Sequence, residues 1–198
     1  TGKYSHKNGV YCLNQSFDDQ PTSATILQQA GYRTGVFGKW HLKSTPQGFD
    51  DYKVLQKQGR YENPEFVEKG TEQLVEHTGW VDDIITEMTQ HFIAEGTESA
   101  QPFFVMCHYK SAHDPWASRP PFDTAYQQIE IPEPANLCDT YIDRSQAARQ
   151  TTLKSEMMDQ KTFSHHRIDT QDTCEQRQHI YQQYVKAYWR SARVMDDN

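Results

Sequence analysis

Two strand-like segments, each following a helical pattern, constrain the fold of this chain more than any other feature of its sequence. Residues 33–37 read Arg-Thr-Gly-Val-Phe, and residues 103–107 form the continuous apolar run Phe-Phe-Val-Met-Cys. Such a run is typical of a strand buried on both faces of a sheet. Helices that alternate with strands favour a mainly parallel sheet covered by helices. The sequence therefore predicts the α/β class.

Three helical patterns accompany these strands. Apolar residues at the spacing of an amphipathic helix predict one helix over 81–92 and another over 181–195. A shorter helix is expected to begin near residues 21–23, where Thr and Ser hydroxyls can cap it. We expect it to bury an apolar face that includes Ile26 and to end at Gly31.

Two long stretches show neither pattern. Residues 44–78 are punctuated by Gly and Pro, and we predict a long loop there. Residues 133–178 are rich in Asp, Gln, Arg and Thr and contain no Gly. This composition indicates a polar insert, which is either a functional lid or a partly disordered excursion. We interpret His165 and His166, inside the insert, as part of a solvated loop rather than a metal site.

The composition narrows the classes of function. The 198 residues carry a formal net charge of −7, without a stripe of Lys or Arg, which argues against nucleic acid as a partner. A local basic pocket can coexist with an acidic surface, so the negative net charge does not exclude an anionic substrate. The hydrophobic content of 35% is low against about 45–50% in typical domains, which predicts a small core. No apolar run approaches the roughly 18 residues of a membrane span.

The four cysteines form no Cys-x-x-Cys pair, which argues against zinc-ribbon and thioredoxin-like motifs. Cys107 lies inside an apolar run and is expected to be buried. Cys138 and Cys174 flank a polar stretch. Spacing does not establish a disulfide, so the sequence leaves their pairing open.

Cationic side chains follow both predicted strands. Lys39 and His41 come after the first strand, two positions apart, and in extended backbone such residues point to the same side. An ammonium beside an imidazole suits an anion and a proton transfer. His113 follows the second strand, and ligands of parallel sheets bind beyond the carboxyl ends of the strands. From the residues alone, a surface lysine with a packed histidine, and a turn at His113, stay open as alternatives.

Four groups of motifs occur in order along the chain. They are Thr-Gly-Lys-Tyr at 1–4, the stretch 32–42 that ends in Gly-Lys-Trp-His-Leu, the pair of motifs at 48–52 and 58–64, and the stretch 103–116. Together they resemble the signatures of the type I, formylglycine-dependent sulfatases. The pair of motifs resembles the subgroup that acts on sulfated sugars, which includes N-acetylglucosamine-6-sulfatase-like and mucin-desulfating-like members.

The resemblance implies an alkaline-phosphatase-like fold of which this chain is a partial domain. Residues 1–198 would be an internal fragment of the N-terminal catalytic domain, and this fragment is expected to be inactive by itself. The resemblance further implies a formylglycine nucleophile upstream of Thr1 and a calcium ion whose ligands lie outside this chain. The implied partner is a sulfated glycan or another sulfate ester. The parent protein is expected to be exported (periplasmic or extracellular) or lysosomal.

The family pattern also implies roles for individual residues. Lys39 would neutralise a sulfate oxygen, His41 would act as a base on the covalent sulfate intermediate, and His113 would assist the leaving group. Lys110 would add positive charge to the same pocket. Trp116 would form either an aromatic platform for a sugar face or ordinary loop packing.

Two departures from the family pattern bear on the substrate. Asp114 stands where related sugar sulfatases often carry a positive residue, and a carboxylate there would repel an anionic glycan. Lys57 stands where a Gly is common. Two other functions stay open: hydrolysis of phosphate mono- or diesters by an enzyme of the alkaline phosphatase superfamily, and glycan binding without catalysis.

Overall fold

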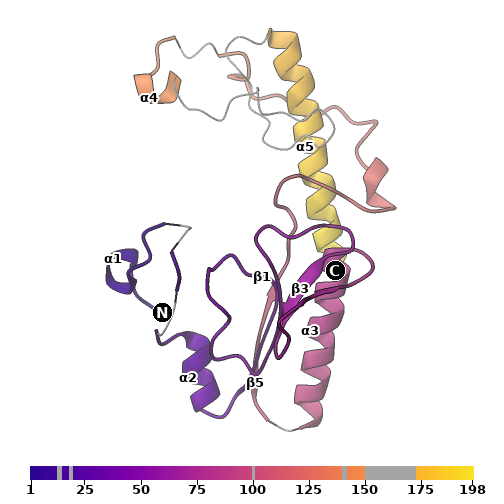
Figure 1. The fold of residues 1–198 in the computed structure, drawn as a ribbon. Coiled ribbons are helices and arrows are strands. Elements are labelled where there is room, and N and C mark those ends of the chain that lie inside the picture. Colours follow the sequence, from indigo (N-terminus) through magenta and orange to yellow (C-terminus); the bar gives the residue numbers. More distant parts are fainter. Residues whose placement is uncertain (13–14, 18–19, 100, 140–141, 150–172) are drawn as a thin grey trace. The chain divides into compact units, whose positions relative to one another are not determined.

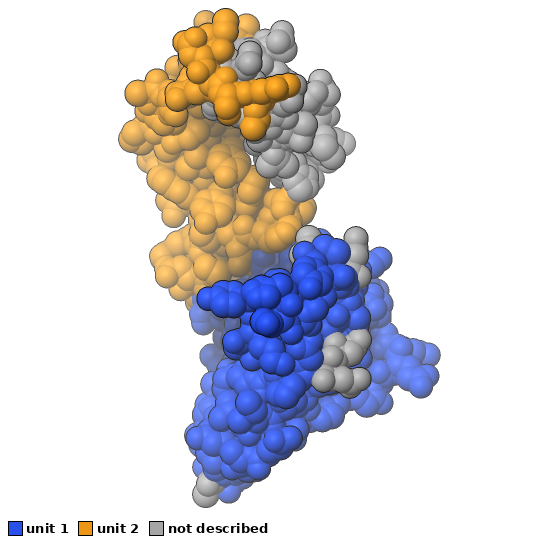
Figure 2. Space-filling model, turned by 90° about the vertical axis from the view of Figure 1, so that its left-hand side faces the viewer, with its two compact units in different colours: residues 1–110, 198 blue, residues 111–197 orange. Residues whose placement is uncertain are grey.

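The computed structural model describes residues 1–12, 15–17, 20–99, 101–139, 142–149 and 173–198 (Figure 1). These residues form two compact units (Figure 2). Unit 1 contains residues 1–110 together with Asn198, and unit 2 contains residues 111–197. Unit 1 holds the sheet and the helices packed on it, and the longest helix of unit 2 is α5 (Cys174–Asp196).

The core of unit 1 is a five-stranded sheet in the order β4-β3-β2-β1-β5. The central strand β1 (Arg33–Lys39) pairs in parallel with β2 (Asp51–Leu55) on one side and with β5 (Phe103–His108) on the other. The strands β3 (Glu65–Glu68) and β4 (Leu74–Glu76) extend the sheet in antiparallel pairing. The predicted α/β class is confirmed, with the parallel pairings at the two strands that the sequence identified.

The prediction of a loop over 44–78 is wrong, because β2, β3 and β4 all lie within it. These strands are short, and the Gly and Pro residues that suggested a loop instead form the turns between them. Tyr52, Val54 and Leu55 are buried in β2, and Phe66 is fully buried in β3. Strands of this length depend on pairing with a neighbour, which a single-sequence pattern does not reveal.

The helices α2 (Ser23–Gln29) and α3 (Val81–Glu98) cover opposite faces of the sheet (Figure 1). Phe92 of α3 packs edge-on against Phe37 of β1, with ring centroids 5.6 Å apart. The opposite face buries Ala24 of α2 against Val36 of β1 in one apolar cluster. Both helices therefore fix the position of β1.

Helix α2 begins as the sequence predicts, but it buries a different face. The Thr22 side chain accepts a hydrogen bond from the backbone N–H of Thr25, which confirms the hydroxyl cap. Gly31 follows the helix with φ +89°, the left-handed conformation of a helix stop. Ile26, however, is 58% exposed and Ala24 is the buried residue, so the predicted apolar face is wrong. In so short a helix one apolar residue does not define the packed side.

Two expectations for β5 are also wrong. This strand is the last in the order of the sheet, and its residues are partly exposed rather than buried on both faces. Cys107 is exposed, although the apolar run around it indicated burial. The apolar run marks the strand correctly, but a pattern of hydrophobicity does not distinguish an edge strand from a central one.

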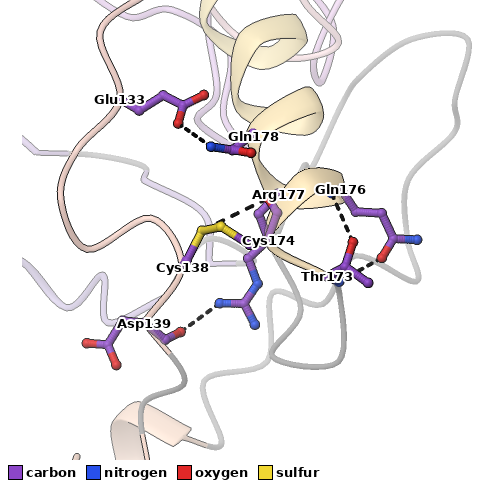
Figure 3. Close-up of a disulfide and its surroundings, with 8 residues drawn as sticks. All are labelled: Glu133, Cys138, Asp139, Thr173, Cys174, Gln176, Arg177 and Gln178. Atoms are coloured by element: carbon purple, nitrogen blue, oxygen red, sulfur yellow. Dashed lines mark hydrogen bonds between the residues drawn. A yellow bond between two sulfur atoms is a disulfide. The ribbon is translucent and has the colours of Figure 1, made fainter.

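Unit 2 contains the short elements η1 (Phe122–Thr124) and α4 (Gln146–Arg149) besides α5. A disulfide joins Cys138 to Cys174 at the first residue of α5, with a Cα–Cα distance of 5.3 Å (Figure 3). The pairing that the sequence left open is therefore made in the structure. Helix α5 buries Val194, whereas Met195, which the predicted apolar face included, is 37% exposed.

The polar insert over 133–178 stays a prediction, because residues 140–141 and 150–172 lie outside the described residues, and His165 and His166 lie there with them. The last residues of this range, from Cys174 on, form the first turn of α5. Within the described part of the chain, every helix is too short or too polar to cross a membrane.

Candidate functional site

The carboxyl end of β1 lies close to β5 because its penultimate residue is a glycine. Gly38 pairs with His108 and has φ +104°, and a Cβ atom at this position would lie 1.9 Å from the His108 carbonyl oxygen. His108 in turn donates a hydrogen bond from Nδ1 to the carbonyl oxygen of Lys39, over 3.1 Å. The backbone that carries Lys39 is therefore fixed by contacts to the neighbouring strand.

A cavity of about 490 Å³ opens at this end of the sheet in unit 1. Lys39 and His41 both line it, which brings together the two residues that the sequence placed on one side of the strand end. Trp40, between them, donates from Nε1 to the carbonyl oxygen of Ser44 over 2.7 Å and packs edge-on against Phe49. The cavity thus combines an ammonium and an imidazole with an apolar wall that includes Trp40, Phe49 and Met106.

The Lys39 ammonium donates a hydrogen bond to the side-chain carbonyl oxygen of Gln58. Gln58 lies in the turn after β2, the strand next to β1. Gln58 begins the motif at 58–64, but the motif itself predicts no role for it. The two residues are 19 positions apart, so no helix or strand periodicity predicts their contact. It could have been predicted only from the order of the strands, because both residues lie at the ends of adjacent strands.

Lys110 lies near the same edge of the sheet, two residues beyond β5, and is 2% exposed. Its Nζ donates to the main-chain carbonyl of Gln58 over 2.9 Å and lies 4.6 Å from the centroid of the Tyr61 ring. Its backbone N–H donates to the buried Asp82 carboxylate over 2.9 Å. The structure therefore brings Lys39 and Lys110 to the same residue, Gln58.

The phenol that precedes Lys110 is neutral at physiological pH. Burial raises the pKa of Tyr109 above its ordinary value, and this effect exceeds the opposing effect of its hydrogen bond with Thr86. The two oxygens of that hydrogen bond lie 2.7 Å apart. A neutral phenol adds no negative charge beside Lys110.

His113 and Trp116 belong to unit 2, whereas Lys39, His41 and Lys110 belong to unit 1. His113 Nδ1 lies 2.6 Å from the Asp114 carbonyl oxygen and 2.8 Å from its carboxylate. Asp114, the departure from the family pattern, thus contacts His113 through both its main-chain and its carboxylate oxygens. Trp116 donates from Nε1 to the carbonyl of Ala112 and packs edge-on against Tyr184 of α5, with ring centroids 4.9 Å apart.

The described residues do not supply a metal site. In the described ranges, no group of three or more His, Cys, Asp or Glu side chains gathers in a way that could hold a metal ion. Calcium prefers several carboxylate and carbonyl oxygens around one point. The calcium ion that the family resemblance implies, with ligands outside this chain, stays a prediction.

Comparisons with known proteins agree with the motifs. The chain matches the family model "Sulfatase" over residues 1–198. It is 42% identical over 160 residues to the N-acetylglucosamine-6-O-sulfatase of Bacteroides thetaiotaomicron, a match that covers 79% of this chain and 28% of the relative. It is 24% identical over 160 residues to the N-acetylglucosamine-6-sulfatase of Homo sapiens, which covers 69% of this chain and 29% of that protein.

A solved structure shows the same fold. The structure of BT4656, described as a complex with its substrate D-glucosamine-2-N,6-O-disulfate, matches with a TM-score of 0.83 and 30% sequence identity. The match covers 100% of this chain and 48% of that protein. The chain thus spans less than a third of the length of the two curated relatives and about half of the solved one.

Proposed function

This chain belongs to the sulfatase family, and we propose that the complete protein hydrolyses the sulfate ester of a sulfated amino sugar. One observation carries the proposal: the whole chain matches a structure described as holding D-glucosamine-2-N,6-O-disulfate as its substrate. The 42% identity to an N-acetylglucosamine-6-O-sulfatase supports the same class of substrate.

In this proposal the cavity at the end of β1 receives the sulfate group. The Lys39 ammonium neutralises a sulfate oxygen and stabilises the charge that develops during the reaction. His41, on the wall of the same cavity, accepts and returns a proton, because an imidazole changes its charge near neutral pH. The support for these roles is that both residues line a cavity large enough for a monosaccharide sulfate.

The proposal extends to the three other residues that the family pattern indicates. His113 would donate a hydrogen bond to the leaving-group oxygen from Nε2, since its Nδ1 faces Asp114. Trp116 would present part of its ring to the sugar. Lys110 would contribute its charge to the site from a buried position, because its ammonium binds Gln58 and the Tyr61 ring.

We propose that residues 1–198 form part of the N-terminal catalytic domain of a longer protein. The formylglycine nucleophile and the calcium ligands of the family would be supplied by other parts of that protein. The residues of this chain bind the substrate, orient it and move protons. The proposal that the complete protein is exported is supported by the Cys138–Cys174 disulfide, because structural disulfides persist in oxidising compartments.

The test uses the complete protein and two esters of the same sugar, N-acetylglucosamine 6-sulfate and N-acetylglucosamine 6-phosphate. We expect release of inorganic sulfate and no comparable release of phosphate. Preferential phosphate release would replace the proposal by phosphoester hydrolysis, and binding of the sulfate ester without turnover would replace it by a glycan-binding role.

Variants of the cavity wall connect that activity to this site. Lys39→Met and His41→Ala are each expected to lower kcat/KM by about 10²- to 10³-fold, the usual effect of removing a charge-stabilising group. Lys43→Met provides the matched control, because Lys43 is exposed two residues beyond His41 and does not line the cavity. An equal loss in all three variants would contradict the assignment of the site.

A further inference from the structure

Gln58 lies between two lysines that reach it from different strands. Its side-chain carbonyl accepts a hydrogen bond from Lys39 at the end of β1, and its main-chain carbonyl accepts one from Lys110 beyond β5. The residue itself lies in the turn that follows β2. The ends of the three adjacent strands β2, β1 and β5 are thus connected through one glutamine.

The contact to Gln58 restrains the long side chain of Lys39. A lysine ammonium sits on a four-carbon stem with many rotamers, so a fixed backbone does not fix the position of the charge. His108 holds the carbonyl of Lys39, and Gln58 holds its ammonium. Catalytic groups act efficiently only when they are held within about 0.5 Å of the productive position.

The turn that carries Gln58 needs an anchor of its own, because Gln58 and the two residues before it are exposed. Lys110 supplies this anchor from below the surface, with 2% exposure and a direct hydrogen bond to the Gln58 carbonyl. Tyr61, three residues later, packs its ring against the same ammonium. A buried ammonium is stable when polar partners surround it, so this arrangement resists displacement.

We propose that Gln58 is a positioning residue for Lys39, and that Lys110 holds Gln58 in place. This inference rests on the proposed sulfate-ester hydrolysis. Gln58 does not need to touch the substrate in this role. Gln58 acts by fixing the position of the Lys39 ammonium. Lys110 acts on Gln58 by holding the backbone of the turn in place.

The first experiment measures kcat/KM of the complete protein with Gln58→Met, which keeps the length of the side chain and removes its acceptor. We expect a loss of about 10- to 100-fold, as for a catalytic group displaced by about 1 Å. Gln56→Met is the matched control, because Gln56 is an exposed glutamine of the same turn, and it is expected to retain full activity.

A double-mutant cycle separates positioning from a general structural effect. In the Lys39→Met background, Gln58→Met is expected to change kcat/KM less than twofold, because there is no ammonium left to position. Lys110→Met is expected to reproduce most of the Gln58→Met loss and to add little to it. The same loss from Gln58→Met with and without Lys39 would overturn the proposal.

A second readout does not depend on turnover, so it remains valid if the proposed activity is wrong. The rate at which acetic anhydride acetylates Lys39, followed by mass spectrometry, reports how firmly its ammonium is held. Gln58→Met is expected to raise this rate several-fold, and Gln56→Met to leave it unchanged. An unchanged rate in Gln58→Met would overturn the positioning role, whereas absent sulfate release from the unmodified protein would overturn the proposed function alone.

Discussion

Lys39 of unit 1 and the two candidate residues of unit 2 are held by different means. In unit 1, Lys39 is the last residue of a strand whose neighbours on both sides are fixed by parallel pairing, and residues 34–38 of that strand are all buried. In unit 2, His113 and Trp116 lie outside any helix or strand. Trp116 is held by one hydrogen bond and by aromatic contacts to α5.

The difference extends to the cores of the two units. Unit 1 buries large apolar side chains on both faces of its sheet, including Phe37 and Phe92. The long helix of unit 2 buries Arg177, Ser191 and Val194, two of which are polar. Arg177 donates from its guanidinium to the carbonyl oxygen of Asp139, beside the disulfide (Figure 3). The sheet of unit 1 is thus held mainly by apolar packing, whereas polar contacts and a disulfide add to the packing of α5 in unit 2.

The largest expected effect comes from breaking the packing of unit 1 at its closest approach. Gly38→Ala places a methyl group 1.9 Å from the His108 carbonyl oxygen in a conformation with φ +104°. Backbone atoms cannot move aside as a flexible side chain can, so we expect a destabilisation of about 4 kcal/mol or more. Urea unfolding of the complete protein measures it.

Gly31→Ala is the matched control for this prediction. Gly31 has a similar φ of +89°, but nothing lies within 4 Å of the Cβ position. This variant has the backbone strain without the clash, and we expect a cost of about 1 kcal/mol. Equal costs at the two glycines would show that the approach of β1 to β5 does not constrain the site.

The next effect tests the covalent constraint of unit 2. Replacing Cys138 and Cys174 by Ala removes a link between residues 36 positions apart, for which loop-closure entropy predicts a loss of about 3–4 kcal/mol. We expect hydrogen exchange to become faster in peptides of unit 2 and to stay unchanged in β1 and α3. Cys12→Ser, at an exposed free cysteine, is the control. Faster exchange throughout unit 1 would show that the units do not differ in this way.

The sequence predicts the fold best where packing is local and periodic. The apolar residues of α3 and the segment of β1 identify both elements, because each forms a self-consistent pattern over several residues. The strands β2, β3 and β4 were missed, since three to five residues carry too little pattern. The exposure of Ile26 and Cys107 was missed because it depends on which neighbours lie against each face.

The candidate site shows the same limit. The spacing of Lys39 and His41 predicts that they point to the same side, and both residues line the same cavity although His41 lies beyond the end of β1. The contacts of Gln58 with Lys39 and Lys110 join three separate strand ends. No local pattern reports such contacts, so they become visible only when the order of the strands is known.

A smaller effect tests a polar link in unit 1, where Asp50 connects the start of β1 to the turn before β2. Burial raises the pKa of Asp50, whereas hydrogen bonds from Thr34 and Gln28 and the charge of Lys69 lower it. The lowering effects are larger together, so the pKa of Asp50 lies below its ordinary value. A lowered pKa in the folded state stabilises the protein above the unfolded pKa of about 3.9, and this contribution is lost as pH falls through the folded pKa.

Asp50→Asn removes the charge that these hydrogen bonds favour, and we expect it to destabilise the protein by about 1 kcal/mol at pH 7. The effect is no larger because Asp50 is an exposed residue and solvent screens part of the interaction. The difference from the unmodified protein should shrink as pH falls from about 4 through the lowered pKa of the folded state, below which the Asp50 carboxyl is neutral like the Asn side chain. Asp51→Asn, at the next residue, is the control. Thermal unfolding across pH 3–7 measures the effect, and a difference that does not change with pH would contradict the ionic origin of this link.

The smallest expected loss of stability comes from the helix caps, a motif that occurs in both units. Thr22 caps α2 and Thr173 caps α5, each in a reciprocal capping box. Thr22→Ala is expected to cost about 1 kcal/mol. Thr173→Ala is expected to cost about half of that, because the disulfide at Cys174, the next residue, already holds the first turn of α5.

Without the disulfide, the cost of Thr173→Ala should rise to the full value, since the two constraints act on the same turn and are not additive. Equal costs with and without the disulfide would mean that the start of α5 is fixed by packing, as α2 is, and the contrast between the two units would not extend to this helix.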